Sequence, residues 1–112
     1  MCEQVFQFVE IVNRLKRGTA EGRVLWERSG TYGQQFKASL DNGHSAAVAC
    51  MPNGKSVVFT MTNGLGVETL HLDSSRTTED LLQLALLQLF VTVRDTQTRH
   101  MAAEALEAVK DF

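Results

Sequence analysis

The sequence predicts an α+β fold in which two helices lie on one face of a five-stranded antiparallel sheet. Apolar residues recur every three or four positions near both ends of the chain, which is the period of a helix. Between these segments, short stretches rich in Val, Phe, Ala and Thr are separated by glycine turns, which is typical of strands. The chain has 112 residues, 44% of them hydrophobic, so we expect a single globular domain over residues 1–112.

The first helix is predicted over Cys2–Arg17. Its apolar residues fall at spacings of three and four and so share one face; they are Val5, Phe8, Val9, Val12 and Leu15. Phe6 lies on the opposite, charged side. Gly18 follows a basic turn and is expected to end the helix.

Five strands are predicted in the middle of the chain. Asn-Gly pairs at 42–43, 53–54 and 63–64, together with a turn at 29–31, tolerate the positive φ angles of hairpin turns. Four consecutive hairpins make a meander in which neighbours in sequence are neighbours in the sheet. The strands are expected at Arg23–Arg28, Tyr32–Leu40, His44–Met51, Lys55–Thr62 and Leu65–Leu72.

The register follows from the rule that paired residues share a face of the sheet. A three-residue loop at Asp41–Gly43 sets Phe36 against Val48 and avoids burying a lysine. A two-residue turn at Asn53-Gly54 sets Val48 against Phe59. The same procedure at the outer hairpins pairs Trp26 with Gln34 and Phe59 with Glu68. The predicted inner face consists of Val24, Trp26, Phe36, Ala38, Leu40, Ala46, Val48, Cys50, Val57, Phe59, Met61, Leu70 and Leu72.

The last segment, Thr77–Phe112, is predicted to be helical. A continuous helix of this length would measure about 52 Å, whereas a compact domain of this size has a radius of gyration of about 13 Å. We therefore expect a break or bend at Arg94–Thr98, where five polar residues interrupt the apolar pattern. If there is no break, the helix must project and pack on a second subunit.

Leu81–Val93 is apolar around nearly its whole circumference. One sheet face and one short helix can cover only part of such a helix, so we expect a homodimer to cover the rest. Burial within the monomer is the alternative. The expected interface residues are Phe6, Leu82, Leu86, Leu89 and Phe90.

Five polar or aromatic residues are candidates for binding a ligand or partner. Trp26, Arg28 and Tyr32 are expected to converge at one end of the sheet, where they form either an interface anchor or ordinary packing. Glu68 is expected to point inward from an edge strand, where it either guards against aggregation or anchors a pocket. His44 begins the third strand and either bonds a turn carbonyl or serves a site.

Composition and motifs argue against several classes of function. The net charge of −2 lacks the basic excess of a general nucleic-acid binder. No apolar run reaches the 20 or so residues of a membrane helix, and the start does not resemble a signal peptide. Neither the histidines nor the cysteines have metal-ligand spacing, and no motif for a cofactor or catalysis is present. Two unpaired cysteines fit a cytoplasmic protein.

The run Gly22–Trp26, the strand that follows it at Tyr32–Leu40 and the repeated glycine hairpins resemble small uncharacterised bacterial proteins, including orphan domains and products of mobile gene cassettes. The resemblance covers roughly Leu15–Phe90. It implies the same order of a helix, a meander and a leucine-rich helix. It implies no activity and no site residues.

The sequence therefore favours a non-catalytic binding module that acts as a homodimer and can receive a protein partner. The alternative is a small-molecule-binding protein or enzyme that uses a pocket between the sheet and the helices.

Overall fold

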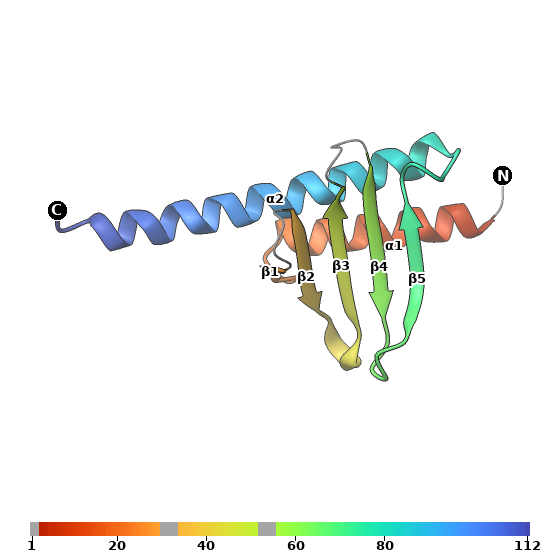
Figure 1. Cartoon of the computed structure of the whole chain (residues 1–112), viewed down its shortest axis with the longest axis horizontal. Helices are drawn as coiled ribbons and strands as arrows, with labels where there is room; N and C mark the ends of the chain where they lie inside the picture. Colours follow the sequence, from red (N-terminus) through yellow and green to blue (C-terminus); the bar gives the residue numbers. More distant parts are fainter. Residues whose placement is uncertain (1–2, 30–33, 52–55) are drawn as a thin grey trace.

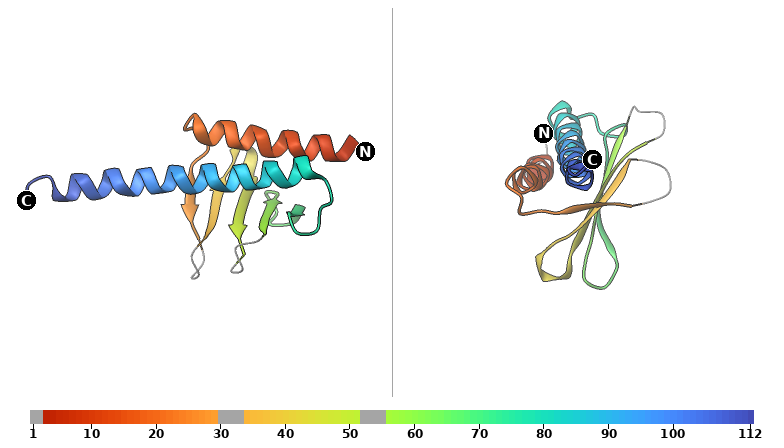
Figure 2. Two further views of the ribbon diagram at one scale, coloured as in Figure 1. Left: turned by 90° about the horizontal axis from the view of Figure 1, so that it is seen from above. Right: turned by 90° about the vertical axis from the view of Figure 1, so that its left-hand side faces the viewer.

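The structure, a computed structural model, describes residues 3–29, 34–51 and 56–112. It confirms the α+β fold, with two helices side by side on one face of a five-stranded sheet (Figure 1; Figure 2, right). All strand pairs are antiparallel and the strand order is β1-β2-β3-β4-β5, the predicted meander. The elements are α1 (Glu3–Ala20), β1 (Trp26–Arg28), β2 (Gln35–Ser39), the 3-10 turn η1 (Asp41–Gly43), β3 (Ser45–Cys50), β4 (Val57–Thr62), β5 (Glu68–Asp73) and α2 (Asp80–Val109).

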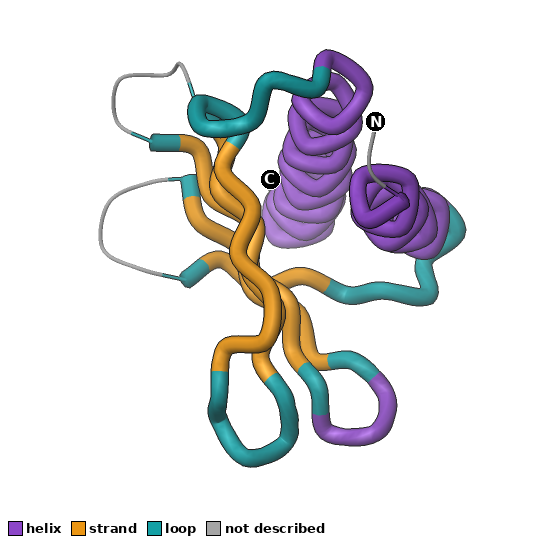
Figure 3. The backbone as a smooth tube through the Cα atoms, turned by 90° about the vertical axis from the view of Figure 1, so that its right-hand side faces the viewer, coloured by secondary structure: helices purple, strands orange, loops and turns teal. Residues whose placement is uncertain are grey.

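The core lies between the inner face of the sheet and the two helices. Every residue of the predicted inner face is either buried or packed against the buried cluster. Val12 and Leu15 of α1 complete the core from the helical side, with Val5, Phe8 and Val9 partly buried beside them. Phe6 lies outside the core, as its helical position predicts. In the part of the chain that the structure describes, no helix lies on the opposite face of the sheet (Figure 3).

The two central strand pairings have the predicted register. Phe36 pairs with Val48 across η1, and Val48 pairs with Phe59 between β3 and β4. Leu40 donates its backbone N–H to the His44 carbonyl at 2.7 Å, which closes the predicted three-residue loop. The turn at Asn53-Gly54 lies outside the described residues.

The two outer pairings were predicted wrongly, each by four residues. Trp26 pairs with Ala38 rather than Gln34. Phe59 pairs with Leu72 rather than Glu68. A four-residue shift is even, so each shifted residue keeps its face of the sheet, and the predicted inner face survives the error.

The side chain of Asn63 explains the shift between β4 and β5. Its Oδ1 accepts hydrogen bonds from the backbone N–H groups of Leu65, at 2.9 Å, and Val67, at 3.0 Å. These bonds hold a loop longer than the predicted two-residue turn. A bulge between Met61 and Thr62 then places Glu68 opposite Thr62.

Helix α1 continues past its predicted stop. Gly18 is buried inside the helix, and a Cβ atom there would lie 2.8 Å from Cγ2 of Val24. Gly22 follows the helix with a φ of 77°, the left-handed conformation that ends helices. Gly18 is therefore required by close packing, and Gly22 terminates the helix.

Helix α2 has no break at Arg94–Thr98, so the expected bend was wrong. Arg and Gln are good helix formers, and neither glycine nor proline occurs in this stretch. The Arg94 guanidinium lies over the Phe90 ring, 5.9 Å from its centroid. The side chain of Gln97 donates a hydrogen bond to the Trp26 carbonyl and fixes α2 against β1. Polar residues are thus accommodated without interrupting the helix.

Beyond β1, α2 extends past the rest of the molecule (Figure 2, left). Every residue from Thr98 to Phe112 is exposed, and we call this stretch the projecting segment. The principal extents are 57 × 32 × 27 Å, and the radius of gyration of 15.1 Å exceeds the value of about 13 Å for a compact domain. The expectation that an unbroken helix must project from the domain is therefore confirmed, whereas its packing on a second subunit stays a prediction.

A hydrogen-bonded turn after β5 sets the start of α2. Ser74 Oγ accepts from the Val57 N–H at 2.8 Å, which ties the turn to β4. Two hydrogen bonds from Ser75 hold the pKa of the Asp73 carboxyl below its usual value of 3.8. Gln83 donates to the carbonyls of Ser74 and Thr77, which fixes the first turns of the helix.

Gly43→Ala tests the backbone requirement of η1. Gly43 has a φ of 81°, and a methyl group there meets nothing closer than 3.5 Å, so any loss comes from the backbone angle. We expect the free energy of unfolding to fall by about 1 kcal/mol or more in denaturant titration. Gly64→Ala in the neighbouring hairpin is the matched control, because its φ is not positive. Equal losses in the two variants would contradict the loop assignment.

Candidate functional site

The polar groups predicted around Trp26 do not gather into a described site. Trp26 is buried, and its Nε1–H donates to Thr19 Oγ1 at 2.8 Å inside the core. Thr19 in turn donates to the Leu15 carbonyl at 2.7 Å. Arg28 is exposed on the edge strand, and Tyr32 lies outside the described residues. The one polar atom of Trp26 thus serves the packing of β1 on α1.

Glu68 does not point inward as predicted. The pairing skips Thr69 of β5, which places Glu68 opposite Thr62, and the side chain of Glu68 is exposed. Its carboxylate lies 3.2 Å from Nδ1 of His71, which is also exposed. Glu68 is therefore part of a surface pair beside the sheet edge and lines no cavity between sheet and helices.

His44 was expected to begin the third strand; it lies one residue before β3, between η1 and Ser45, and is partly buried. Among the described residues, its Nδ1 has no hydrogen-bond partner. The residue borders an open hollow at this end of the sheet, together with Arg23, Ser39 and Asp41. This hollow is the one place where a predicted candidate lies beside other polar side chains.

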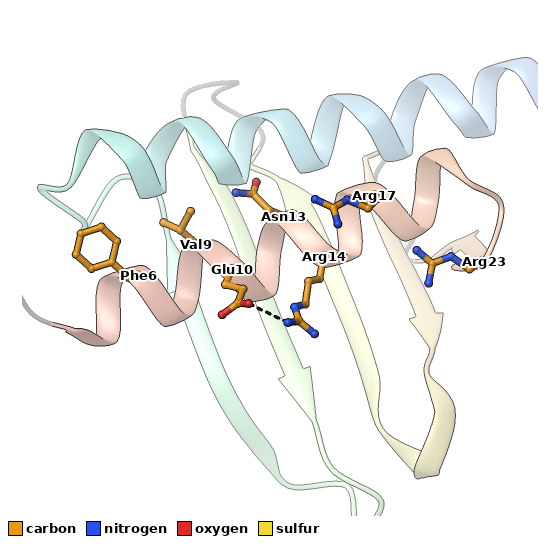
Figure 4. Close-up of a pocket in the computed structure, with 7 residues that line it drawn as sticks. All are labelled: Phe6, Val9, Glu10, Asn13, Arg14, Arg17 and Arg23. Carbon is orange, nitrogen blue, oxygen red and sulfur yellow. Dashed lines mark hydrogen bonds and ion pairs between the residues drawn. The ribbon is translucent and has the colours of Figure 1, made fainter.

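A second hollow lies on the outer side of α1 (Figure 4). It includes Phe6, whose side chain is 56% exposed, and three arginines. Arg14 pairs with Glu10 at 2.9 Å, and Arg23 pairs with Glu21 at 2.7 Å. These pairs are exposed and partly neutralise Arg14 and Arg23, and among the described residues Arg17 is the one arginine of the hollow without a salt bridge.

Within the described ranges, no three His, Cys, Asp or Glu side chains come together in a group that could hold a metal ion. Cys50, a free thiol, is partly buried at the end of β3. It borders a recess with the hydroxyl residues Ser56, Ser74 and Ser75.

The leucines expected at a dimer interface lie in the core of the monomer instead. Leu82, Leu86, Leu89 and Phe90 are 3% exposed or less. They sit on the side of α2 that faces the sheet and α1, together with Ala85 and Val93. These four residues therefore cannot form the outer surface. An apolar pattern around the whole helix gave no means to tell the inner side from the outer.

The outward side of α2 carries a second set of leucines that the sequence argument did not select. Leu81, Leu84 and Leu87 are each about half exposed. Their spacing of three, followed by Val91 four residues after Leu87, is a signal that the sequence does contain. In the projecting segment, Met101, Leu106, Val109 and Phe112 are also exposed. An apolar surface thus runs along α2 well beyond the sheet.

A groove between the helices joins this surface. Its lining combines Leu87 and Val91 of α2 with Ala20 of α1. Lys16 closes one side, donating from Nζ to Gln88 Oε1 at 3.0 Å. The groove and the exposed leucines are continuous through Leu87, which makes the outward side of α2 the candidate functional surface.

Comparison with known proteins finds no match among the protein-family models, the curated proteins or the solved structures. In the part of the chain that the structure describes, neither helix is both long and apolar enough to cross a membrane. What the molecule does must therefore be inferred from its own surface.

Thr19→Val tests whether the hydrogen bond of Trp26 is structural. The substitution keeps the shape but leaves the buried indole N–H without an acceptor, so we expect the free energy of unfolding to fall by about 1–3 kcal/mol. Thr69→Val, at an exposed hydroxyl on β5, is the control and should change it by less than about 0.5 kcal/mol. In a cycle with Trp26→Phe, the two losses should not add, because either change removes the same bond. Additive losses would show that the bond is not the stabilising contact.

Proposed function

We propose that this protein is a non-catalytic interaction module in which two copies associate through the outward side of α2. The observation that carries the proposal is the uninterrupted helix, whose apolar outer side continues past the domain into the projecting segment. Self-association gives this surface a partner without additional components, because each patch can meet its own copy.

The projecting segment argues for a partner on thermodynamic grounds. Its helical part, Thr98–Val109, has no tertiary contact that buries a side chain. Isolated helices shorter than about 12–15 residues are marginal in water even when rich in alanine. The segment includes four alanines and exposes Met101, Leu106 and Val109. Covering these side chains would supply the burial that the segment lacks within one chain.

We propose a non-catalytic function because the polar candidate residues are dispersed over the structure. Trp26 bonds within the core, Glu68 lies on the surface beside His71, and His44 lies at the hairpin end of the sheet. Catalysis requires a nucleophile, an acid or base and a stabilising group to converge on one reacting atom. A half-buried free thiol at Cys50 supports assigning the protein to a reducing compartment such as the cytoplasm. Bacterial origin rests on the resemblance alone.

A small-molecule site at the His44 hollow is the second candidate. It is favoured by Nδ1 of His44, which has no hydrogen-bond partner among the described residues and lies beside Arg23 and Asp41. A thermal-shift screen against metabolites separates the two functions, because a ligand at 100 times its Kd stabilises the fold by about 2.7 kcal/mol. A hit that disappears in His44→Asn would transfer the functional assignment to this hollow.

Light scattering at micromolar concentration should give a mass near twice the 12.4 kDa of the chain. The double variant Leu84→Glu, Leu87→Glu should be monomeric and remain folded, because both side chains are already half exposed in the monomer. The mass is read in the same experiment as a circular-dichroism melt, which reports folding.

Leu65→Glu is the matched control, since Leu65 is 89% exposed on the β4–β5 loop, away from α2. It should leave the dimer intact. A monomeric wild-type chain at these concentrations would reject the proposal, as would a dimer that the control variant and the α2 variant disturb equally.

A further inference from the structure

The side of α2 that faces the domain changes character at Gln97. Steps of three and four residues carry this side from Leu86 and Leu89 to Val93, and all three side chains are fully buried. The next step reaches Gln97, which is partly buried. Beyond it, the same steps reach residues that are exposed and polar or charged: His100, Glu104 and Glu107. Gln97 is therefore the last residue on this side of α2 that the domain covers.

The side chain of Gln97 contacts the shortest strand of the sheet. Its Nε2 donates a hydrogen bond to the carbonyl of Trp26 in β1, which has three residues and lies at one edge of the sheet (Figure 1). An edge strand has backbone groups that no neighbouring strand can pair. Gln97 supplies a partner for a backbone group of this strand, at the point where the covered part of α2 ends.

The acceptor of this hydrogen bond is itself held in place. Trp26 is buried, and its Nε1–H donates to Thr19 Oγ1 at 2.8 Å. The Thr19 hydroxyl in turn donates to the Leu15 carbonyl at 2.7 Å. Consecutive hydrogen bonds therefore connect α1, β1 and α2. A movement of α2 at Gln97 would have to displace a buried indole ring or break one of these bonds.

The projecting segment beyond Gln97 has much weaker support. All its side chains are exposed, and the ion pair at its end, between Lys110 and Glu107, lies within the helix itself. A short helix that is held only by its own backbone bonds is marginal in water. Among the described residues, Gln97 is thus the last point at which a hydrogen bond or a covered side chain joins α2 to the domain.

We infer that Gln97 is the positioning residue of the projecting segment: its hydrogen bond to Trp26 sets the direction in which the helix leaves the domain. With that direction set, Met101, Leu106 and Val109 are presented in one arrangement, which lowers the entropy cost of binding a partner. The effect on association rests on the proposed function, whereas the positioning itself does not require it.

The distance between two spin labels tests the positioning within a single chain. In a background with Cys2→Ser and Cys50→Ser, the labels are attached at Thr69→Cys on β5 and at Glu107→Cys on the projecting segment, two exposed positions. The monomeric double variant of α2 is used, so that each distance is measured within one chain. We expect a narrow distance distribution, whose width is set by the labels themselves.

Gln97→Met should widen this distribution beyond the width set by the labels, because methionine keeps the length of the side chain but has no donor. Gln97→Lys restores a donor and should narrow the distribution again. His100→Met, the matched control at the next position on the same side, removes no contact with the domain and should change nothing. Circular dichroism verifies that each variant is folded.

Three outcomes of the label experiment overturn the inference. They are a wide distribution with Gln97 in place, an unchanged width in Gln97→Met, and equal widening by Gln97→Met and His100→Met. Because the experiment uses a monomer, its result does not depend on whether the wild-type chain forms a dimer.

Sedimentation equilibrium of the unlabelled chain, without the substitutions that make it monomeric, tests the consequence for association. Gln97→Met should weaken dimerisation about two- to tenfold, the equivalent of one hydrogen bond, and His100→Met should not. An unchanged dissociation constant in Gln97→Met overturns the role of Gln97 in association. A wild-type chain that stays monomeric overturns the proposed function alone, and the label distances then decide the positioning.

Discussion

The length of α2 is the constraint on which the rest of the structure depends. Its 30 residues correspond to about 45 Å, whereas α1 has 18 residues and the strands have at most six. Nothing else in the described chain can cover a helix of this length. The first half is secured by Leu86, Leu89 and Val93 in the core and by Gln97 at β1. The second half leaves the domain with apolar side chains in water, and we propose that a second copy covers them.

The faces of the sheet could be predicted because alternation is robust to error. The pairings of Trp26 and Phe59 were each displaced by four residues, yet both side chains remained inside. Glu68, which was expected to point inward, is the exception. The register shift at Met61/Thr62 pairs it with Thr62 instead of Phe59, which is an odd displacement of three residues, and it lies on the surface. The cause was the side chain of Asn63, which holds a long loop where the Asn-Gly pair suggested a short turn. Local propensity does not reveal such a bond.

The candidate surface could be predicted only in part. Apolar residues all around a helix indicate that two of its sides must be covered. They do not indicate which of these sides of α2 faces the sheet. We predicted Leu82, Leu86 and Leu89 at the interface, but these residues meet the core, whereas Leu84 and Leu87 are half exposed. Because we expected a compact domain, we also predicted a bend at Arg94–Thr98. The spacing of three and four residues that begins at Leu84 continues through Arg94 and Thr98 to Met101, which would have favoured a continuous helix.

Residue-resolved amide hydrogen exchange over a dilution series tests the central claim, that a second copy covers the projecting segment. An uncovered helix of this length opens readily, whereas amides in the core strands β3 and β4 open only with the whole domain. At concentrations where the chain is a dimer, the amides of Met101–Val109 should be protected. On dilution to monomer they should lose that protection while β3 and β4 keep theirs. Rapid exchange of Met101–Val109 in the dimer, or unchanged protection in the monomer, would contradict the account.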